Sequence, residues 1–288
     1  MLGSNFMWGL MSPIAKVAMA AGIIGPLMMT GFRIVGAAIL FWVASLFTRH
    51  EHVPAADKAR LAGAAMLGIL FNQGCFIFGV GFTSPGEASI ITTTMPMWVM
   101  VLAAIFLREP VTVRKAGGIL IGAAGALILV LGSAGYTGGG DRPLLGDLLV
   151  LGAQLSYALY LTIYKNFIAR YSLVTLMKWM FTFAAIVLTP FVAPTALSTA
   201  WSAMTPTLWA CVAYVVVGGT FVAYICVMIG QKNLRPTIVG MYNYVQPIVA
   251  SGVGVVLGFD RFTPMKVLAV VLIFTGVFLV TTSRARAT

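Results

Sequence analysis

The residues best suited to hold a solute are a few polar side chains that interrupt long apolar runs of the sequence. Residues 235–254 read as a hydrophobic helix, yet they carry Asn243, Gln246 and Pro247 near their middle. In lipid, such groups are tolerated only where they pack against protein or line a wet cavity. A proline within a helix also removes a backbone hydrogen bond and permits bending. This stretch is therefore typical of a cavity wall in a protein that changes shape.

Polar and aromatic side chains interrupt other apolar runs in the same way. Asn72 and Gln73 are adjacent amides, and interhelical hydrogen bonding, worth about 0.6 kcal/mol, explains them as well as a cavity-facing role does. Thr92 begins a run of three threonines, of which at least one is expected to bond back to its own helix. Tyrosine stripes on two further runs are packing or belt residues more often than ligand contacts. The predicted solute-binding set is Asn72, Gln73, Thr92, Pro96, Tyr157, Tyr224, Asn243, Gln246 and Pro247.

Charged side chains inside the apolar runs are few, and the deep ones are basic. Lys16, Arg33 and Lys178 lie within about two turns of an interface, so snorkelling is favoured, with attraction of an anionic group as the functional alternative. Of the seven acidic residues, only Glu87 could reach inward. Ser84 and Glu87 fit a capping box, in which the carboxylate returns to the backbone N–H of the cap. The sequence therefore predicts no midspan carboxylate, and a neutral, zwitterionic or anionic solute.

Catalytic and metal chemistry find little support in the residue types present. His50 and His52 are the only histidines and lie in one polar loop, whereas a membrane enzyme such as a lipid phosphatase needs clustered His, Asp, Glu or Ser. The three cysteines lie inside apolar segments and give neither a disulfide framework nor a zinc spacing. We therefore expect no enzyme, no cofactor and no bound metal. The net charge of +11 does not indicate nucleic acid, because the basic residues sit at the ends of apolar runs.

The composition predicts an integral membrane protein. The 288 residues are 60% hydrophobic and 9% charged, with a mean hydropathy of +0.99, whereas soluble domains carry about 25% charged residues. Apolar runs of about 20 residues recur, and each can cross a bilayer as a helix. The first run starts at Leu2 without a basic leader, so no cleavable signal peptide is expected. Ten spans are predicted, near residues 2–21, 26–47, 61–82, 86–106, 113–132, 146–168, 173–193, 207–230, 236–257 and 265–283.

The basic residues also set the expected orientation. If the N-terminus is cytoplasmic, twelve Lys and Arg residues face the cytoplasm and three face the opposite side. Basic residues accumulate in cytoplasmic loops. Both termini are therefore expected in the cytoplasm. The protein itself is expected in a bacterial cytoplasmic membrane.

The second half of the chain repeats a pattern of the first. Sliding the sequence by 151 positions aligns prolines, threonines and charged residues in order, without a gap. Five spans per unit is an odd number, so the second unit would enter the membrane inverted. We predict an all-α integral membrane fold of ten transmembrane helices as two inverted five-helix repeats, residues 1–132 and 146–288, joined by a linker at 133–145. The aligned pairs are Pro85/Pro236, Thr92/Asn243, Pro96/Pro247, Glu109/Asp260, Thr112/Thr263, Lys115/Lys266 and Gly125/Gly276.

Several short motifs lie at characteristic places in these spans: Glu109-Pro110 after the fourth span, and Trp8-Gly9, Phe32-Arg33, Ser84-Pro85, Pro96 and Gly146-Asp147. With the predicted spans, they make the chain similar to the drug/metabolite transporter superfamily over nearly its whole length. The EamA-like family is the best match. The resemblance implies the fold predicted above and export of amino acids or other metabolites. Residues 240–244 are similar to a segment of aromatic amino acid exporters with this fold.

The favoured function is a carrier of small organic metabolites such as amino acids, acting as an exporter by alternating access of the two halves. Its site is expected near the midplane, where the fourth and ninth spans meet. The expected partners are the solute and the lipid bilayer, with no nucleic acid. A proton-coupled multidrug or cation antiporter is the alternative, and such a protein typically uses an embedded carboxylate. A pure channel is a third interpretation, which the repeat and the midspan prolines disfavour.

Overall fold

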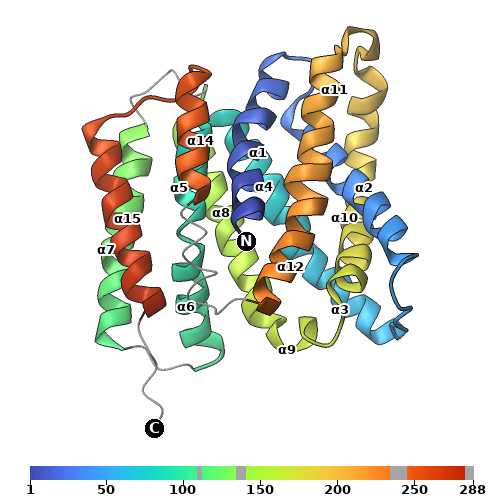
Figure 1. The fold of residues 1–288 in the computed structure, drawn as a ribbon, viewed down its shortest axis with the longest axis horizontal. Coiled ribbons are helices and arrows are strands. Elements are labelled where there is room, and N and C mark those ends of the chain that lie inside the picture. The colour runs from blue at the N-terminus through green and yellow to red at the C-terminus, as the bar shows by residue number, and fades with distance from the viewer. Residues whose placement is uncertain (109–111, 134–140, 234–244, 283–288) are drawn as a thin grey trace.

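The computed structural model describes residues 1–108, 112–133, 141–233 and 245–282, and this part of the chain contains helices and no strands (Figure 1). The helices pack side by side as a bundle, which confirms the predicted all-helical fold. The elements are α1 (Leu2–Ala20), α2 (Pro26–Ser45), α3 (Ala55–Ala65), η1 (Met66–Phe71), α4 (Asn72–Phe82), α5 (Pro85–Thr92), α6 (Met95–Phe106), α7 (Val113–Ser133), α8 (Pro143–Ile163), α9 (Lys165–Ile168), α10 (Leu173–Ser198), η2 (Trp201–Ala203), α11 (Pro206–Ala213), η3 (Tyr214–Val222), α12 (Ala223–Asn233), α14 (Val245–Val256) and α15 (Pro264–Thr282).

Seven helical segments in the described residues are long and apolar enough to cross a membrane, so the chain is an integral membrane protein. They are α2, α8, α10 and α15, together with the joined segments Ala55–Phe82, Pro85–Phe106 and Pro206–Val227. α1, α7 and the shorter apolar helix α14 lie in the other three predicted spans. α10 is longer than predicted and continues through Pro190 and Pro194. Prolines are tolerated in membrane helices because neighbouring groups satisfy the freed backbone.

The start of α5 follows the sequence signal only in part. Ser84 accepts a hydrogen bond from the Glu87 backbone N–H at 3.2 Å, which confirms the predicted cap. The second half of the capping box is wrong, because the Glu87 carboxylate turns to Thr83 and Lys266 instead. A charged partner and a hydroxyl bind a carboxylate more strongly than one backbone N–H does. The side chain of Glu87 therefore joins α5 to another helix.

Two of the long helical segments contain π-helical turns, η1 between α3 and α4 and η3 between α11 and α12. In each, a side chain of a neighbouring helix donates to a backbone carbonyl. Ser156 of α8 donates to Leu67 at 2.8 Å, and Trp8 of α1 donates to Gly219 at 3.0 Å. π-Helical turns are frequent at functional sites, and both donor helices here also line the central cavity.

The outer helices of the bundle associate in pairs. α7 packs along α15, and α2 packs along α10, where the rings of Phe41 and Phe181 stack at 5.6 Å. The first pair stands at one edge of the bundle in Figure 1. A Cβ at Gly276 would lie only 2.5 Å from the Gly118 carbonyl oxygen and 2.6 Å from the Gly122 nitrogen. The sequence spacing Gly118-xxx-Gly122 is a close-packing signal in membrane helices, and this close approach confirms it.

Candidate solute cavity

A cavity of about 300 Å³ lies in the middle of the bundle. Its walls come from α1, α2, α4, α5 and α6 in the first half of the chain and from α8, α12 and α14 in the second. α1 approaches α14 closely, because a Cβ at Gly9 would lie 2.9 Å from the Gln246 carbonyl oxygen. Ligand cavities have volumes from about 300 Å³ upward. The cavity is therefore large enough for a small organic molecule.

Six of the nine predicted site residues line this cavity. The Nδ2 of Asn72 donates to the Ala153 carbonyl at 2.9 Å, and the Nε2 of Gln246 donates to Asn5 Oδ1 at 2.6 Å. Thr92 bonds back to its own helix at 2.8 Å, as expected for that run of threonines. The fold brings these residues together from separate apolar runs, and their contact with a solute stays a prediction. The six are Asn72, Thr92, Pro96, Tyr157, Tyr224 and Gln246.

The other three predicted residues do not line the described cavity wall. Gln73 and Pro247 are buried outside the lining, and Asn243 lies outside the described residues. Neither amide atom of Gln73 has a hydrogen-bond partner of standard geometry, although its side chain interacts electrostatically with Tyr224. An unsatisfied buried amide destabilises a fold by about 1–3 kcal/mol. The buried amide of Gln73 therefore lacks the standard hydrogen bonds that the amides of Asn72 and Gln246 make.

Arg33 lines the cavity, which corrects its predicted place at the membrane interface. Its side chain is 5% exposed, and its Nε donates to Thr220 Oγ1 at 2.9 Å. No acidic side chain belongs to the cavity wall as far as the described residues define it. A guanidinium presents several planar donors that suit carboxylate and phosphate groups. A guanidinium in this wall would attract an anionic group and repel a cation.

Aromatic side chains surround this charge. The rings of Trp8 and Tyr224 meet edge to face at 6.0 Å, and Tyr157 and Phe76 also line the wall. Trp8 is not among the predicted site residues, and its one signal in the sequence is the Trp8-Gly9 motif. Aromatic rings offer apolar faces to the carbon skeleton of a ligand. In the described residues, the wall therefore combines the Arg33 guanidinium with a largely apolar surface.

Two further buried lysines also contradict snorkelling. Lys16 is 7% exposed and donates to the carbonyls of Gly81 and Thr83, at 2.6 and 3.0 Å, where α4 ends. The ammonium of Lys178 lies 4.6 Å from the centre of the Trp42 ring, in a cation–π contact. Each lysine finds within the protein the partners that it would otherwise seek in water.

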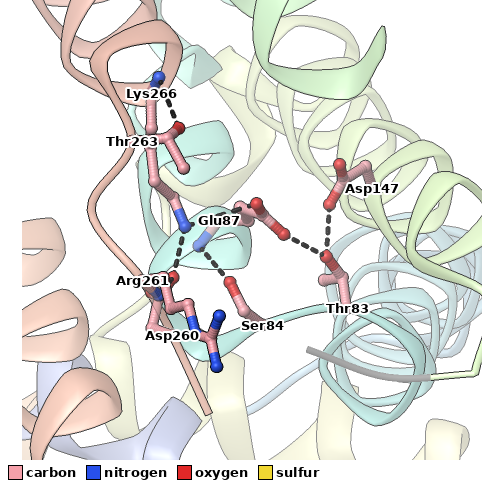
Figure 2. Close-up of polar contacts among 8 residues, drawn as sticks. All are labelled: Thr83, Ser84, Glu87, Asp147, Asp260, Arg261, Thr263 and Lys266. Atoms are coloured by element: carbon pink, nitrogen blue, oxygen red, sulfur yellow. Dashed lines mark hydrogen bonds and ion pairs between the residues drawn. The ribbon is translucent and has the colours of Figure 1, made fainter. Parts of the chain in front are cut away.

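A charged cluster joins α5, α8 and α15 at the N-terminal end of α5 (Figure 2). Lys266 contacts Asp260 and lies 3.3 Å from Glu87. Thr83 Oγ1 lies 2.9 Å from Glu87 Oε2 and 2.6 Å from Asp147 Oδ1. Burial raises the pKa of Asp260, and the attraction of Lys266 opposes this rise. Glu87 is two residues from Ser89 in the cavity wall, so the cluster lies just beyond one end of the cavity.

Comparison with known proteins shows the family to which this fold belongs. The profile of the EamA-like transporter family matches residues 1–131 and 144–282. The chain belongs to this family. Its cavity is thus that of an EamA-like membrane transporter.

Individual relatives agree with the family assignment. The chain is 28% identical over 265 residues to "Uncharacterized inner membrane transporter YedA" of Escherichia coli (strain K12), covering 89% of this chain and 81% of that protein. It is 24% identical over 252 residues to "Uncharacterized transporter YetK" of Bacillus subtilis (strain 168), covering 86% of this chain and 76% of the relative. A solved crystal structure matches 97% of this chain and 98% of its own, with a TM-score of 0.63 at 18% identity, which supports the fold alone.

Proposed function

We propose that this EamA-like protein carries small organic metabolites, such as amino acids, across the membrane, and that the solute is neutral, zwitterionic or anionic. The observation that carries the proposal is Arg33 in the wall of a cavity whose described lining holds no acidic side chain. Asn72, Thr92, Tyr157, Tyr224 and Gln246 would supply polar and aromatic contacts around it. A proton-coupled antiporter of cations is disfavoured, since Arg33 repels a cation and offers no competing site for a proton.

Alternating access is proposed to use two inverted repeats, residues 1–132 and 146–288, joined by the linker 133–145. Equal spacing of the elements supports this. α3 and α11 begin 151 residues apart (55 and 206), as do α7 and α15 (113 and 264), and η1 and η3 end at the same spacing (71 and 222). The outer pairs also join elements that would correspond, α7 with α15 and α2 with α10. Inverted repeats with a central site are the usual basis of alternating access.

The direction of transport is proposed to be export across a bacterial cytoplasmic membrane, with both termini in the cytoplasm. The excess of twelve cytoplasmic Lys and Arg over three supports this orientation. A cysteine placed in residues 135–142 of a variant without native cysteines should react with an impermeant reagent added outside intact cells. Tags at both termini should be inaccessible from outside. The opposite pattern would refute the orientation.

The solute class can be tested by a thermal-shift and transport screen of the purified protein against a metabolite library. A ligand that binds only the folded state raises its stability, so carboxylates and zwitterions should raise the unfolding temperature. Arg33→Ala should abolish that rise, whereas Lys178→Ala, which removes a buried cation outside the cavity, should keep it. Stabilisation by quaternary ammonium compounds alone would overturn the proposal.

A further inference from the structure

A groove of about 660 Å³ lies between α2 and α10 on the outer surface of the bundle. These two helices stand at the edge of the bundle opposite α7 and α15 (Figure 1). From the first to the last lining residue each helix rises about 12 Å, which is close to the depth of one leaflet of a hydrocarbon core about 30 Å thick. The largely apolar lining consists of Val35, Ala38, Ile39, Trp42 and Val43 of α2 and Thr182, Ala185, Ile186, Thr189 and Pro190 of α10.

One end of this groove carries two aromatic rings with a lysine against each. Trp42 lines the groove and meets Trp179 edge to face, with the ring centres 5.6 Å apart. The ammonium of Lys178 lies 4.6 Å from the centre of the Trp42 ring, and that of Lys58 lies 4.5 Å from the centre of the Trp179 ring. Two positive charges therefore stand at the Trp42 end of the groove.

The ammonium of Lys178 is buried, yet its donors are available. The side chain is 8% exposed, and its ammonium contacts the rings of Trp42 and Trp179 and interacts electrostatically with Glu51. The described part of the chain offers its N–H groups no hydrogen-bond acceptor. The ring faces stabilise the positive charge, and the three N–H groups of an ammonium remain able to donate. An oxygen from outside the protein could accept them.

Basic residues outnumber acidic ones around this end of the groove. Both acids already have partners, because Asp57 lies 3.7 Å from Arg60 and accepts from Tyr171, while Glu51 accepts from the Ser172 backbone N–H. A surplus of positive charge beside a membrane helix attracts anionic lipids. Residues 49–60 and 170–178 carry the basic Arg49, Lys58, Arg60, Arg170 and Lys178 and the acidic Glu51 and Asp57.

An ordinary belt of interfacial aromatic residues does not account for the position of Trp42. In such belts the polar edge of the indole faces the wet side of the interface. Here the Nε1 of Trp42 donates to Thr182 Oγ1 at 2.8 Å, so the indole is tied across the groove from α2 to α10. An aromatic wall and a cation are thus held in place before a ligand arrives, which lowers the cost of binding one.

We propose that this groove binds an anionic phospholipid, with an acyl chain along α2 and α10 and the phosphate at Lys178 and Lys58. A phosphate oxygen would accept from the N–H groups of Lys178, and basic pockets between membrane helices bind anionic head groups. The apolar groove beside the lysines favours a lipid over free phosphate, which has no chain to place there. The site lies outside the central cavity and does not depend on which solute that cavity binds.

The first test is quenching of tryptophan fluorescence by brominated acyl chains in mixed vesicles. Brominated phosphatidylglycerol should quench the unaltered protein more than the same fraction of brominated phosphatidylcholine, and Trp42→Phe should remove most of this difference. Lys178→Ala and Lys58→Ala should each weaken the preference about fivefold, as expected for one lysine at an anionic surface. Arg114→Ala, at an exposed basic residue of α7, should keep it. Equal quenching of the unaltered protein by the two lipids would overturn the proposal without any variant.

The second test separates the possible occupants by thermal unfolding in detergent. Short-chain phosphatidylglycerol should raise the unfolding temperature more than phosphatidylcholine of the same chain length, because it binds the folded state. Ala185→Phe, which places a ring in the groove, should reduce this rise. An equal rise with glycerophosphoglycerol or inorganic phosphate would assign the lysines to a free anion and overturn the proposal. A dimer in lipid-free detergent that Ala185→Phe converts to a monomer would also overturn it, because a second copy would then fill the groove.

Discussion

Arg33 and Thr220 are 187 residues apart in the sequence, and the Nε of Arg33 donates to the Thr220 hydroxyl at 2.9 Å. Thr220 lies in η3 and donates in turn to the Val215 carbonyl, five residues earlier, at 2.8 Å. This spacing is that of the π-helix. One hydroxyl group therefore fixes both the π-helical turn and the guanidinium. The backbone of η3 thus determines where the positive charge stands in the cavity wall.

Thr220→Val should destabilise the protein by about 1–3 kcal/mol, because a buried charged donor loses its partner. It should also weaken binding of any carboxylate ligand that the screen identifies, since Arg33 would no longer be held in place. Unfolding in detergent and ligand-induced thermal shifts measure the two effects.

Thr189→Val is the matched control for Thr220→Val. The Thr189 hydroxyl is exposed and donates only to the Ala185 carbonyl of its own helix, at 2.6 Å. It should change stability little. If the two variants were equally stable, the link between η3 and Arg33 would be refuted.

Features that depend on neighbouring residues could be predicted from the sequence. Apolar runs of sufficient length predicted the helices, and Ser84 before Pro85 predicted the start of α5. The glycines at 118 and 122 predicted close packing, because small residues on one face allow backbones to approach. These signals are local, so no knowledge of the partner was needed.

Features that depend on a distant partner could not be predicted. The capping box gave Glu87 a local partner, whereas the fold supplies Lys266, 179 residues later. Lys16, Arg33 and Lys178 are near the ends of their helices, which favoured snorkelling, but carbonyls, a hydroxyl and aromatic rings from other elements surround them. A buried charge is stable only with such partners, and one sequence does not show which segments will meet.

Ser84→Ala should destabilise the protein by about 1 kcal/mol, because it removes the side chain that accepts from the first turn of α5. Ser84→Gly should destabilise the protein by only about a few tenths of a kcal/mol, since glycine leaves the backbone accessible and suits the cap. Unfolding curves of the two variants measure the difference. Equal losses would show that Ser84 acts through packing and not as a cap.

Glu51 should make the stability of the fold at the start of α10 weakly dependent on pH. Burial acts to raise the pKa of Glu51, but hydrogen bonds from Thr175 and Ser172 outweigh it and lower the pKa below its ordinary value. An acid of this kind stabilises the fold above its unfolded pKa, about 4.3, and the contribution is lost as the pH falls through the lower folded value.

Because Glu51 is largely solvated, the contribution should stay below about 1 kcal/mol. Hydrogen exchange at Ser172, whose backbone N–H donates to Glu51 at 3.0 Å, should accelerate at acidic pH beyond the intrinsic rate. Glu51→Gln should remove this extra dependence. An unchanged pH profile in that variant would assign the effect to another group.

Gly276→Ala should separate α7 from α15 and destabilise the protein. The added methyl group would lie 2.5 Å from the Gly118 carbonyl oxygen and 2.6 Å from the Gly122 nitrogen, and backbone atoms cannot rotate away. Overpacking of this kind costs about 1–3 kcal/mol.

Gly117→Ala is the control on the facing helix, because a Cβ at Gly117 meets nothing within 4 Å. It should be neutral or stabilising by up to about 1 kcal/mol, since alanine favours a helix over glycine. Opposite signs for these two substitutions, measured by unfolding in detergent, would establish that α7 and α15 are held together by backbone approach. A loss of similar size in both would instead point to a general intolerance of α7 and α15 to added volume.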